Sequence, residues 1–174
     1  MNADELRAIQ APLKARMREQ PESALFQVRA QGRLGEAVTC RIGSGAGQVT
    51  AGLHPVAGGS GREACSGDML LEALVACAGV TMQAVALSMG IALRDGRVIA
   101  EGEIDARGTL GVAKDAPVGF RNIRLRFELD TDAPAEQVET LVRLTERYCV
   151  IYQTLRHPPV LSVDAVVTAP GGAG

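Results

Sequence analysis

A long apolar stretch, residues 69–93, constrains the fold of this chain more than any other feature. It exceeds the roughly 18 residues that suggest a membrane span, but Glu72 and Gln83 interrupt it and its composition is rich in Ala rather than in Leu, Ile or Phe. We therefore interpret it as a helix that is buried on nearly all sides. A single domain of this size can hardly cover such a helix alone, so the stretch predicts an obligate homodimer.

Composition and charge exclude several classes of function. The 174 residues suffice for one domain, and 47% hydrophobic with 22% charged residues is typical of a globular protein. The net charge of −2 and the absence of Trp argue against nucleic-acid binding, which needs a basic face or aromatic stacking platforms. No C-x-x-C pair occurs, so we expect neither a zinc ribbon nor a thioredoxin-type motif, and we expect no metal or organic cofactor. The N-terminus lacks the apolar region of a signal peptide, so we expect a cytoplasmic protein with reduced thiols and no membrane association.

Hydrophobic periodicity divides the chain into three parts. Residues 3–19 predict an amphipathic helix, which marks an N-terminal extension over residues 1–22. Residues 23–170 form the predicted main domain, and the tail at residues 171–174 is expected to be disordered.

Within the main domain, the pattern predicts an α+β fold with largely antiparallel sheets. A meander comes first, with glycine turns at 31–35 and 43–47, followed by the long helix, which Ser66 caps and Gly90 ends. The predicted strands of the domain cover residues 25–30, 37–42, 48–53, 98–107, 120–129 and 161–168. One further helix begins near Pro134 and is broken by residues 156–159. The outer faces of strands 98–107 and 120–129 are acidic and mainly basic respectively, which predicts cross-strand charge pairing in a hairpin.

Two of the four cysteines lie within predicted helices. From the residues alone, Cys77 and Cys149 fit either of two roles. Each is a small buried hydrophobe, or it is a reactive thiol whose thiolate is stabilised by a cation from elsewhere in the fold. Cys40 and Cys65 lie in a strand and in a polar loop and have no partner in the pattern.

Two segments resemble motifs of the OsmC/Ohr family. Residues 66–77, SGDMLLEALVAC, are similar to the family's helix opening that leads through an Ala-rich turn to a cysteine. Residues 146–155, ERYCVIYQTL, are similar to its second-cysteine helix. The resemblance covers roughly residues 24–168 and leaves the N-terminal helix as an addition. It implies an OsmC-like fold, with antiparallel sheets around a long buried central helix, and an intertwined homodimer with active sites near the subunit interface.

The resemblance also implies an activity. The family's thiol-dependent peroxidases reduce organic hydroperoxides to alcohols in the oxidative stress response. Cys77 resembles the peroxidatic cysteine and Cys149 the resolving cysteine, which implies a Cys77 sulfenic acid and a Cys77–Cys149 disulfide. The implied partners are a second copy of the chain, an organic hydroperoxide and a dithiol reductant, either a lipoyl protein or a thioredoxin-like one.

The resemblance assigns a cation to the site. The family's catalytic arginine lies at the turn between the first strands, so Arg33 is the nearest match, with Arg29 and Arg41 as alternatives.

A carboxylate is implied nine or ten residues before the first cysteine, where this chain has Asp68 and Gly67. Nine residues are two and a half helical turns, so Asp68 faces away from Cys77 on a regular helix. It is therefore expected to contribute only from an irregular first turn or across the dimer.

The alternative function is a non-enzymatic OsmC-like stress protein that binds an apolar ligand, with both cysteines as packing residues.

Overall fold

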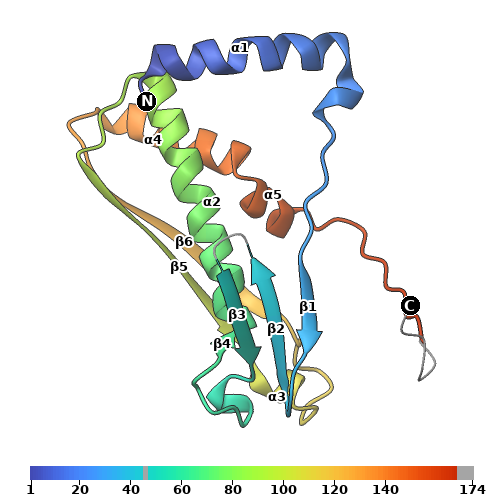
Figure 1. The fold of residues 1–174 in the computed structure, drawn as a ribbon. Helices are drawn as coiled ribbons and strands as arrows, with labels where there is room; N and C mark the ends of the chain where they lie inside the picture. The colour runs from blue at the N-terminus through green and yellow to red at the C-terminus, as the bar shows by residue number, and fades with distance from the viewer. Residues whose placement is uncertain (45–46, 168–174) are drawn as a thin grey trace.

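The computed structural model describes residues 1–44 and 47–167. They form two sheets and a long central helix, α2 (Ser66–Met89), and this arrangement confirms the predicted α+β class (Figure 1). Cys65, not Ser66, occupies the N-cap position of α2, and no side chain caps its first turn. Gly90 ends the helix in the left-handed conformation at φ 69°, as its position predicted.

The central helix is buried along one stripe only. The stripe repeats every four residues and comprises Leu74, Ala78, Met82 and Ala86. On the opposite side Val80 is 73% exposed. The expectation of a helix buried on nearly all sides is therefore wrong for the single chain, because the chain supplies packing partners for one face. By length and composition alone, α2 would be able to cross a membrane.

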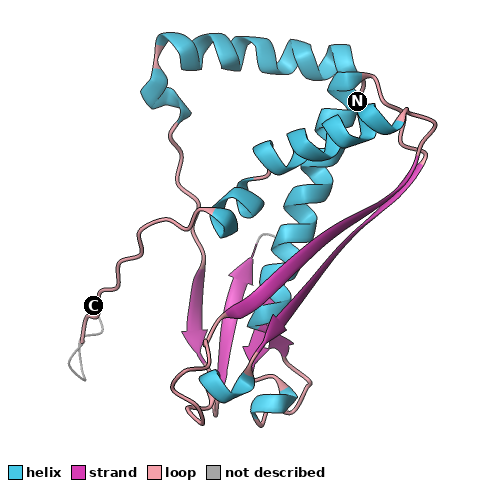
Figure 2. Cartoon of the chain, turned by 180° about the vertical axis from the view of Figure 1, so that it is seen from behind, coloured by secondary structure: helices cyan, strands magenta, loops and turns pink. Residues whose placement is uncertain are grey.

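The buried stripe of α2 packs against the β5–β6 hairpin and the helices that follow it (Figure 2). Strands β5 (Asp95–Ile104) and β6 (Phe120–Asp130) pair antiparallel, with the short helix α3 (Ala106–Thr109) in their connection. Glu101 of β5 is the register partner of Arg124 of β6, and Glu103 forms an ion pair with Arg121 at 3.3 Å, which confirms the predicted cross-strand charge pairing.

The C-terminal helix differs from its prediction. It is interrupted at Cys149, so that α4 (Ala135–Tyr148) and α5 (Val150–Arg156) are separate helices. Cys149 has extended backbone angles, φ −73° and ψ 109°. It is both the C-cap residue of α4 and the N-cap residue of α5. The side-chain amide of Gln153 donates from Nε2 to the Glu146 carbonyl at 2.7 Å and so satisfies an acceptor in the last turn of α4. The prediction that Cys149 lies inside a helix is therefore wrong.

The first sheet has the order β1-β2-β3-β4. Its strands are β1 (Gln31–Leu34), β2 (Thr39–Ser44), β3 (Gly47–Gly52) and β4 (Ala64–Cys65), and the short helix η2 (Pro55–Ala57) lies between β3 and β4.

The position of the first turn corrects the prediction for this sheet. Residues 31–34 are a strand rather than a turn, and the strand predicted at 25–30 is not formed. The chain turns instead between Gly35 and Thr39, where the Gly35 amide donates to the Thr39 carbonyl and the Thr39 hydroxyl donates to the Glu36 carbonyl. The predicted turn at 43–47 includes residues 45 and 46, which lie outside the described residues.

The C-terminal segment after α5 extends away from the body, whereas the N-terminal helix lies across the end of the molecule where α2 finishes (Figure 1). Helix α1 (Ala3–Glu19) confirms the predicted amphipathic helix. It has no buried residue, begins with a capping box between Asn2 and Glu5, and is followed by η1 (Pro21–Ala24). The division of the chain at residue 22 stays a prediction.

The predicted final strand is not formed over residues 161–167, and residue 168 and the tail at 171–174 lie outside the described part. Leu161 is 85% and Val163 93% exposed there. An alternating pattern needs a neighbouring strand to pair with, and these residues pair with none of the described strands.

Candidate functional site

The fold brings Cys77 and Cys149 together although 72 residues separate them in the sequence. Cys77 lies in the middle of α2 and is half-buried, whereas Cys149 is fully buried. Both belong to one apolar cluster with Leu74 and Ala78 of α2. Both thiols are free, and they lie close enough for each to shift the pKa of the other.

The break at Cys149 supplies further donors to Cys77. Because α5 starts at Val150, the amides of its first turn have no carbonyl partner within the helix. The Tyr152 amide donates to the Cys149 Sγ at 3.5 Å, and the backbone groups of Ile151 and Val150 are near enough to Cys77 to lower its pKa. A continuous helix would direct these amides to carbonyls one turn earlier.

These contacts shift the pKa values of the two thiols in opposite directions. Burial opposes ionisation of Cys77. Hydrogen bonds from the Ile151 backbone, the Cys149 thiol, the Val150 backbone and the Thr81 hydroxyl outweigh it and lower the pKa of Cys77 below its ordinary value. At Cys149, burial raises the pKa, and the hydrogen bond to Cys77 and the negative charge there raise it further. Cys77 is therefore the thiol of the pair that ionises more readily.

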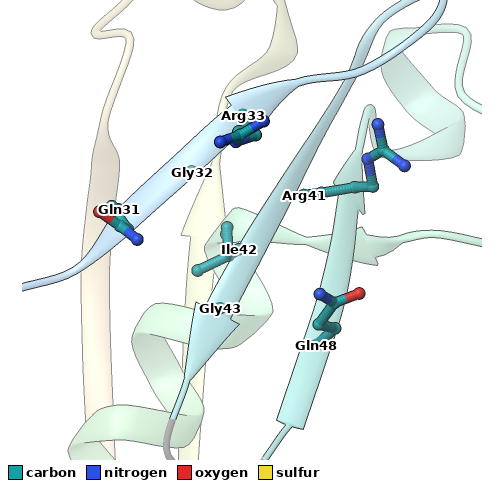
Figure 3. A pocket seen from close by; sticks show the side chains of 7 residues that line it. All are labelled: Gln31, Gly32, Arg33, Arg41, Ile42, Gly43 and Gln48. Carbon is teal, nitrogen blue, oxygen red and sulfur yellow. The ribbon is translucent and has the colours of Figure 1, made fainter.

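No arginine of the described chain is among the groups that lower the Cys77 pKa. Arg33 lies on β1 and Arg41 on β2, and both side chains are exposed on the first sheet (Figure 3). Arg29 is exposed as well and donates to the Gln27 side chain at 3.2 Å. Among the residues that the structure describes, groups that lower the Cys77 pKa by hydrogen bonding are therefore present, but no positive charge is among its neighbours that shift it.

Asp68 does not join the cysteines in the single chain. It stands in the first turn of a regular α2, nine residues before Cys77, and is exposed. Nine residues rotate the helix by half a turn beyond two full turns and advance it by about 13 Å, so Asp68 faces away from Cys77. It lines instead a cavity of about 590 Å³ at the start of α2, together with apolar residues that include Leu53, Leu70 and Phe120.

Sequence reasoning missed three contributors to the site. Thr81 lies four residues after Cys77 on the same face of α2, a spacing that the sequence does display. The backbones of Val150 and Ile151 contribute because the helix breaks before them, and neither Pro nor Gly marks this break in the sequence.

Among residues 1–44 and 47–167, no group of three or more His, Cys, Asp or Glu side chains is arranged to hold a metal ion.

Comparison with protein families gives one match. Residues 59–164 match the model of the family described as OsmC-like protein, and this range contains both cysteines and more than half of the chain. A comparison with curated proteins gives no match.

Solved structures agree with the family match. An OsmC-like protein from Mycoplasma pneumoniae is similar with a TM-score of 0.65 at 18% identity, over 76% of this chain and 89% of that one. An organic hydroperoxide resistance protein from Elizabethkingia anophelis is similar with a TM-score of 0.63 at 16% identity, over 78% and 91%. The organic hydroperoxide resistance protein OsmC from Legionella pneumophila is similar with a TM-score of 0.61 at 18% identity, over 77% and 92%. At these identities the likeness establishes the fold.

Proposed function

Because the chain belongs to the OsmC family, we propose that it is a cysteine-based peroxidase that reduces organic hydroperoxides to alcohols. The observation that carries the proposal is the contact between Cys77, whose pKa is lowered, and Cys149, whose pKa is raised. Proteins of this fold from Legionella pneumophila and Elizabethkingia anophelis are described as organic hydroperoxide resistance proteins. A thiolate with a protonated thiol beside it has the two sulfurs that such a reaction cycle needs.

The proposed reaction proceeds in three balanced steps. The Cys77 thiolate attacks the distal oxygen of the hydroperoxide, and the O–O bond breaks to give a Cys77 sulfenic acid and an alkoxide, which takes up a proton to become the alcohol. The Cys149 sulfur then attacks the sulfenic sulfur, and water leaves as the disulfide forms. An external dithiol, on a lipoyl or thioredoxin-like protein of the cytoplasm, reduces the disulfide by exchange and is itself oxidised.

A second copy of the chain is part of this proposal. Within one chain Cys77 lacks a cation, and the face of α2 around Val80 is exposed. A homodimer that covers this face would bring the cation from the second copy. Arg33 is the first candidate, with Arg29 and Arg41 as alternatives, and Asp68 of the second copy would orient it. A guanidinium there would stabilise both the thiolate and the charge that develops on the leaving oxygen.

Titration with cumene hydroperoxide tests the cysteine chemistry. We expect one equivalent to form an intrachain Cys77–Cys149 disulfide, seen by peptide mapping without reductant. Cys77→Ser abolishes peroxide consumption, whereas Cys149→Ser consumes one equivalent and leaves a sulfenic acid that a specific reagent traps. Cys65→Ser is the matched control and keeps full consumption. A wild-type Cys77 that remains a thiol after many equivalents of peroxide contradicts the proposal.

The pH dependence of alkylation tests the pair more directly. Since Cys149 is among the groups that lower the pKa of Cys77, Cys149→Ala removes one of the causes of that shift. We expect the midpoint of Cys77 alkylation to move to higher pH in this variant, so that the rate near neutral pH falls. An unchanged midpoint would show that the two thiols do not interact in solution.

A second candidate function is binding of an apolar ligand without catalysis. The cavity of about 590 Å³ at the start of α2 favours it, because most of its lining is apolar and its size suits a small organic molecule. If Cys77 proves inert to peroxide, this cavity becomes the functional site. Loss of ligand binding on Leu70→Asp would then identify it.

A further inference from the structure

Helix α1 carries an apolar stripe that its own chain leaves largely uncovered. Large apolar side chains recur at spacings of three or four residues along one side of the helix, namely Leu6, Ile9, Leu13 and Met17. Ile9 is 55%, Leu13 44% and Met17 38% exposed. No residue of α1 joins either of the two core clusters of the described residues, so the stripe lies outside the core of its own chain.

The helix is tethered to the body of the molecule rather than packed into it. It lies across the end of the molecule where α2 finishes, and residues 20–30 connect it to β1 (Figures 1 and 2). Residues 25–30 of this connection form neither helix nor strand, and the family match begins only at residue 59. An isolated helix of 17 residues is marginal in water, so a partner that covers the stripe would stabilise α1.

The charges of α1 differ between its two ends. Asp4 and Glu5 stand in the first turn, and Arg16 and Arg18 stand in the last turn. Glu5 and Arg16 are eleven residues apart, which is close to three full turns, so they lie on the same flank of the stripe. Neither Arg16 nor Arg18 forms an ion pair within residues 1–44 or 47–167. The helix is therefore complementary in charge to a second copy of itself that runs in the opposite direction.

We propose that the α1 helices of two copies of the chain pair antiparallel through this stripe and that the pair strengthens the homodimer. A two-fold axis near the middle of α1 sets Leu6 of one copy against Met17 of the other, and Ile9 against Leu13. Each apolar side chain of the stripe then meets an apolar side chain of the second copy.

The same axis pairs the charges at the two ends. It brings the Glu5 carboxylate of one copy toward the Arg16 guanidinium of the other, twice by symmetry. The opposed dipoles of the two helices also attract each other. On the other flank, Asp4 already holds Arg7 at 3.0 Å within each copy, which reduces the repulsion between the basic side chains there.

The inference rests on the homodimer of the proposed function, because the helix pair alone is small. Two helices of 17 residues bury less surface than a stable and specific interface needs. Once two chains are joined as proposed, the tethers at residues 20–30 hold both α1 helices at a high local concentration. Pairing of the helices then adds to the stability of a dimer that already exists.

Charge and composition favour a second copy over a membrane surface as the partner of α1. The helix has four basic residues against three acidic ones, which leaves a net charge of +1. Its stripe contains four large apolar side chains and no aromatic ring. Helices that lie on anionic membranes typically have a strongly basic polar face and a larger apolar face that contains aromatic residues.

Cysteine crosslinking in the full chain tests the pairing. Gln10 lies beside the stripe in the middle of α1, so Gln10→Cys lies close to its own copy across the two-fold axis. Ala15 lies on the opposite side of the helix, and Ala15→Cys is the matched control. We expect a short bifunctional maleimide to join two chains at position 10 but not at position 15, as read by peptide mapping. Equal crosslinking at both positions, or crosslinking at neither, overturns the proposal.

Sedimentation measures how much the pairing adds to the dimer. Leu13→Asp places a charge in the stripe and raises the dissociation constant of the dimer by about tenfold or more, because the apolar burial is lost. Ala15→Asp puts the same charge on the opposite side and leaves the constant unchanged. Arg16→Glu sets a negative charge against Glu5 of the second copy and raises the constant by about twofold to fivefold. Adding Glu5→Gln, which keeps the capping box, reverses part of that loss.

The outcomes separate this inference from the proposed function. A dimer that consumes peroxide but is unaffected by Leu13→Asp overturns the pairing alone. Crosslinking through Gln10→Cys in a protein that consumes no peroxide supports the pairing and contradicts the peroxidase. A wild-type chain that stays monomeric contradicts both the pairing and the proposed homodimer. Binding to phosphatidylserine vesicles that Leu13→Asp abolishes, while the dimer is unaffected, identifies a membrane surface as the partner and overturns the pairing.

Discussion

The two sheets of the molecule differ in how far one chain completes them. The β5–β6 hairpin packs one face on α2, and residues such as Val98, Ile123 and Leu125 join the cluster around Leu74 and Cys149. In the first sheet, Leu34 is 91% exposed, and the segment that leads into β1 exposes Leu25 and Phe26 by 84% and 85%.

The charges follow the same division. Arg97 and Arg121 in the hairpin pair with Glu128 and Glu103 across the strands. Arg33 and Arg41 in the first sheet pair with no described residue. The hairpin is therefore stabilised by contacts within its own chain, whereas the first sheet exposes its apolar and charged groups. A second copy of the chain is the occupant that we propose for the first sheet.

The largest expected effect is on the free energy of unfolding when a leucine is replaced by alanine, and it differs between the two regions. Leu141 of α4 is fully buried against Met82, Ala86 and Ile91, so Leu141→Ala leaves a cavity and lowers the free energy of unfolding by about 2–5 kcal/mol. Leu34→Ala changes it by less than about 0.5 kcal/mol at concentrations where the chain is monomeric, because Leu34 is already exposed.

Urea denaturation at several protein concentrations measures both effects. If the second copy covers the first sheet, the effect of Leu34→Ala increases with concentration while that of Leu141→Ala does not. A large effect of Leu34→Ala in the monomer would contradict the comparison.

The sequence predicts the hairpin region better than the first sheet for a physical reason. Helix α2 and strands β5 and β6 show clear periodicity, and their neighbours lie in the same chain, so local pattern and tertiary packing agree. The apolar segment at 25–30 also has the composition of a strand, but the hydrogen bonds between Gly35 and Thr39 fix the turn farther along the chain. Residues 161–167 alternate as a strand does, yet no described strand pairs with them.

In the candidate site, too, some residues were predictable from the sequence and others were not. The resemblance to a family pointed to Cys77 and Cys149, and the fold brings the two together. The amides of Val150 and Ile151 were not predictable, since a helix break without Pro or Gly leaves no local signal. No arginine of the described residues is among the groups that shift the Cys77 pKa, so the cation of the site stays a prediction.

A smaller effect distinguishes glycines of the two sheets. A Cβ at Gly102 in β5 would overlap the ring of Phe120, so the ring must move, and Gly102→Ala lowers the free energy of unfolding by about 1–3 kcal/mol. Gly43→Ala in β2 meets nothing within 4 Å and changes it by less than about 0.5 kcal/mol. Thermal unfolding of the two variants measures the difference. Equal losses would show that Gly43 is also in contact in solution.

The smallest effect concerns an ion pair at the end of the hairpin. Arg107 donates to Asp105 at 2.6 Å, and this contact lowers the pKa of the Asp105 carboxyl to about 2. Because the pKa is depressed in the folded chain, the stabilisation is fully present above the ordinary value of 3.8 and is lost as the pH falls toward 2. Arg107→Gln returns the pKa of Asp105 toward 3.8, and its effect on the free energy of unfolding at pH 6 disappears below pH 2. Carboxyl shifts in an NMR titration give the pKa directly, and Arg41→Gln serves as the control, since Arg41 has no carboxylate partner in the described chain. A pKa of Asp105 that stays the same in Arg107→Gln would show that this charge is as unpaired in solution as those of the first sheet.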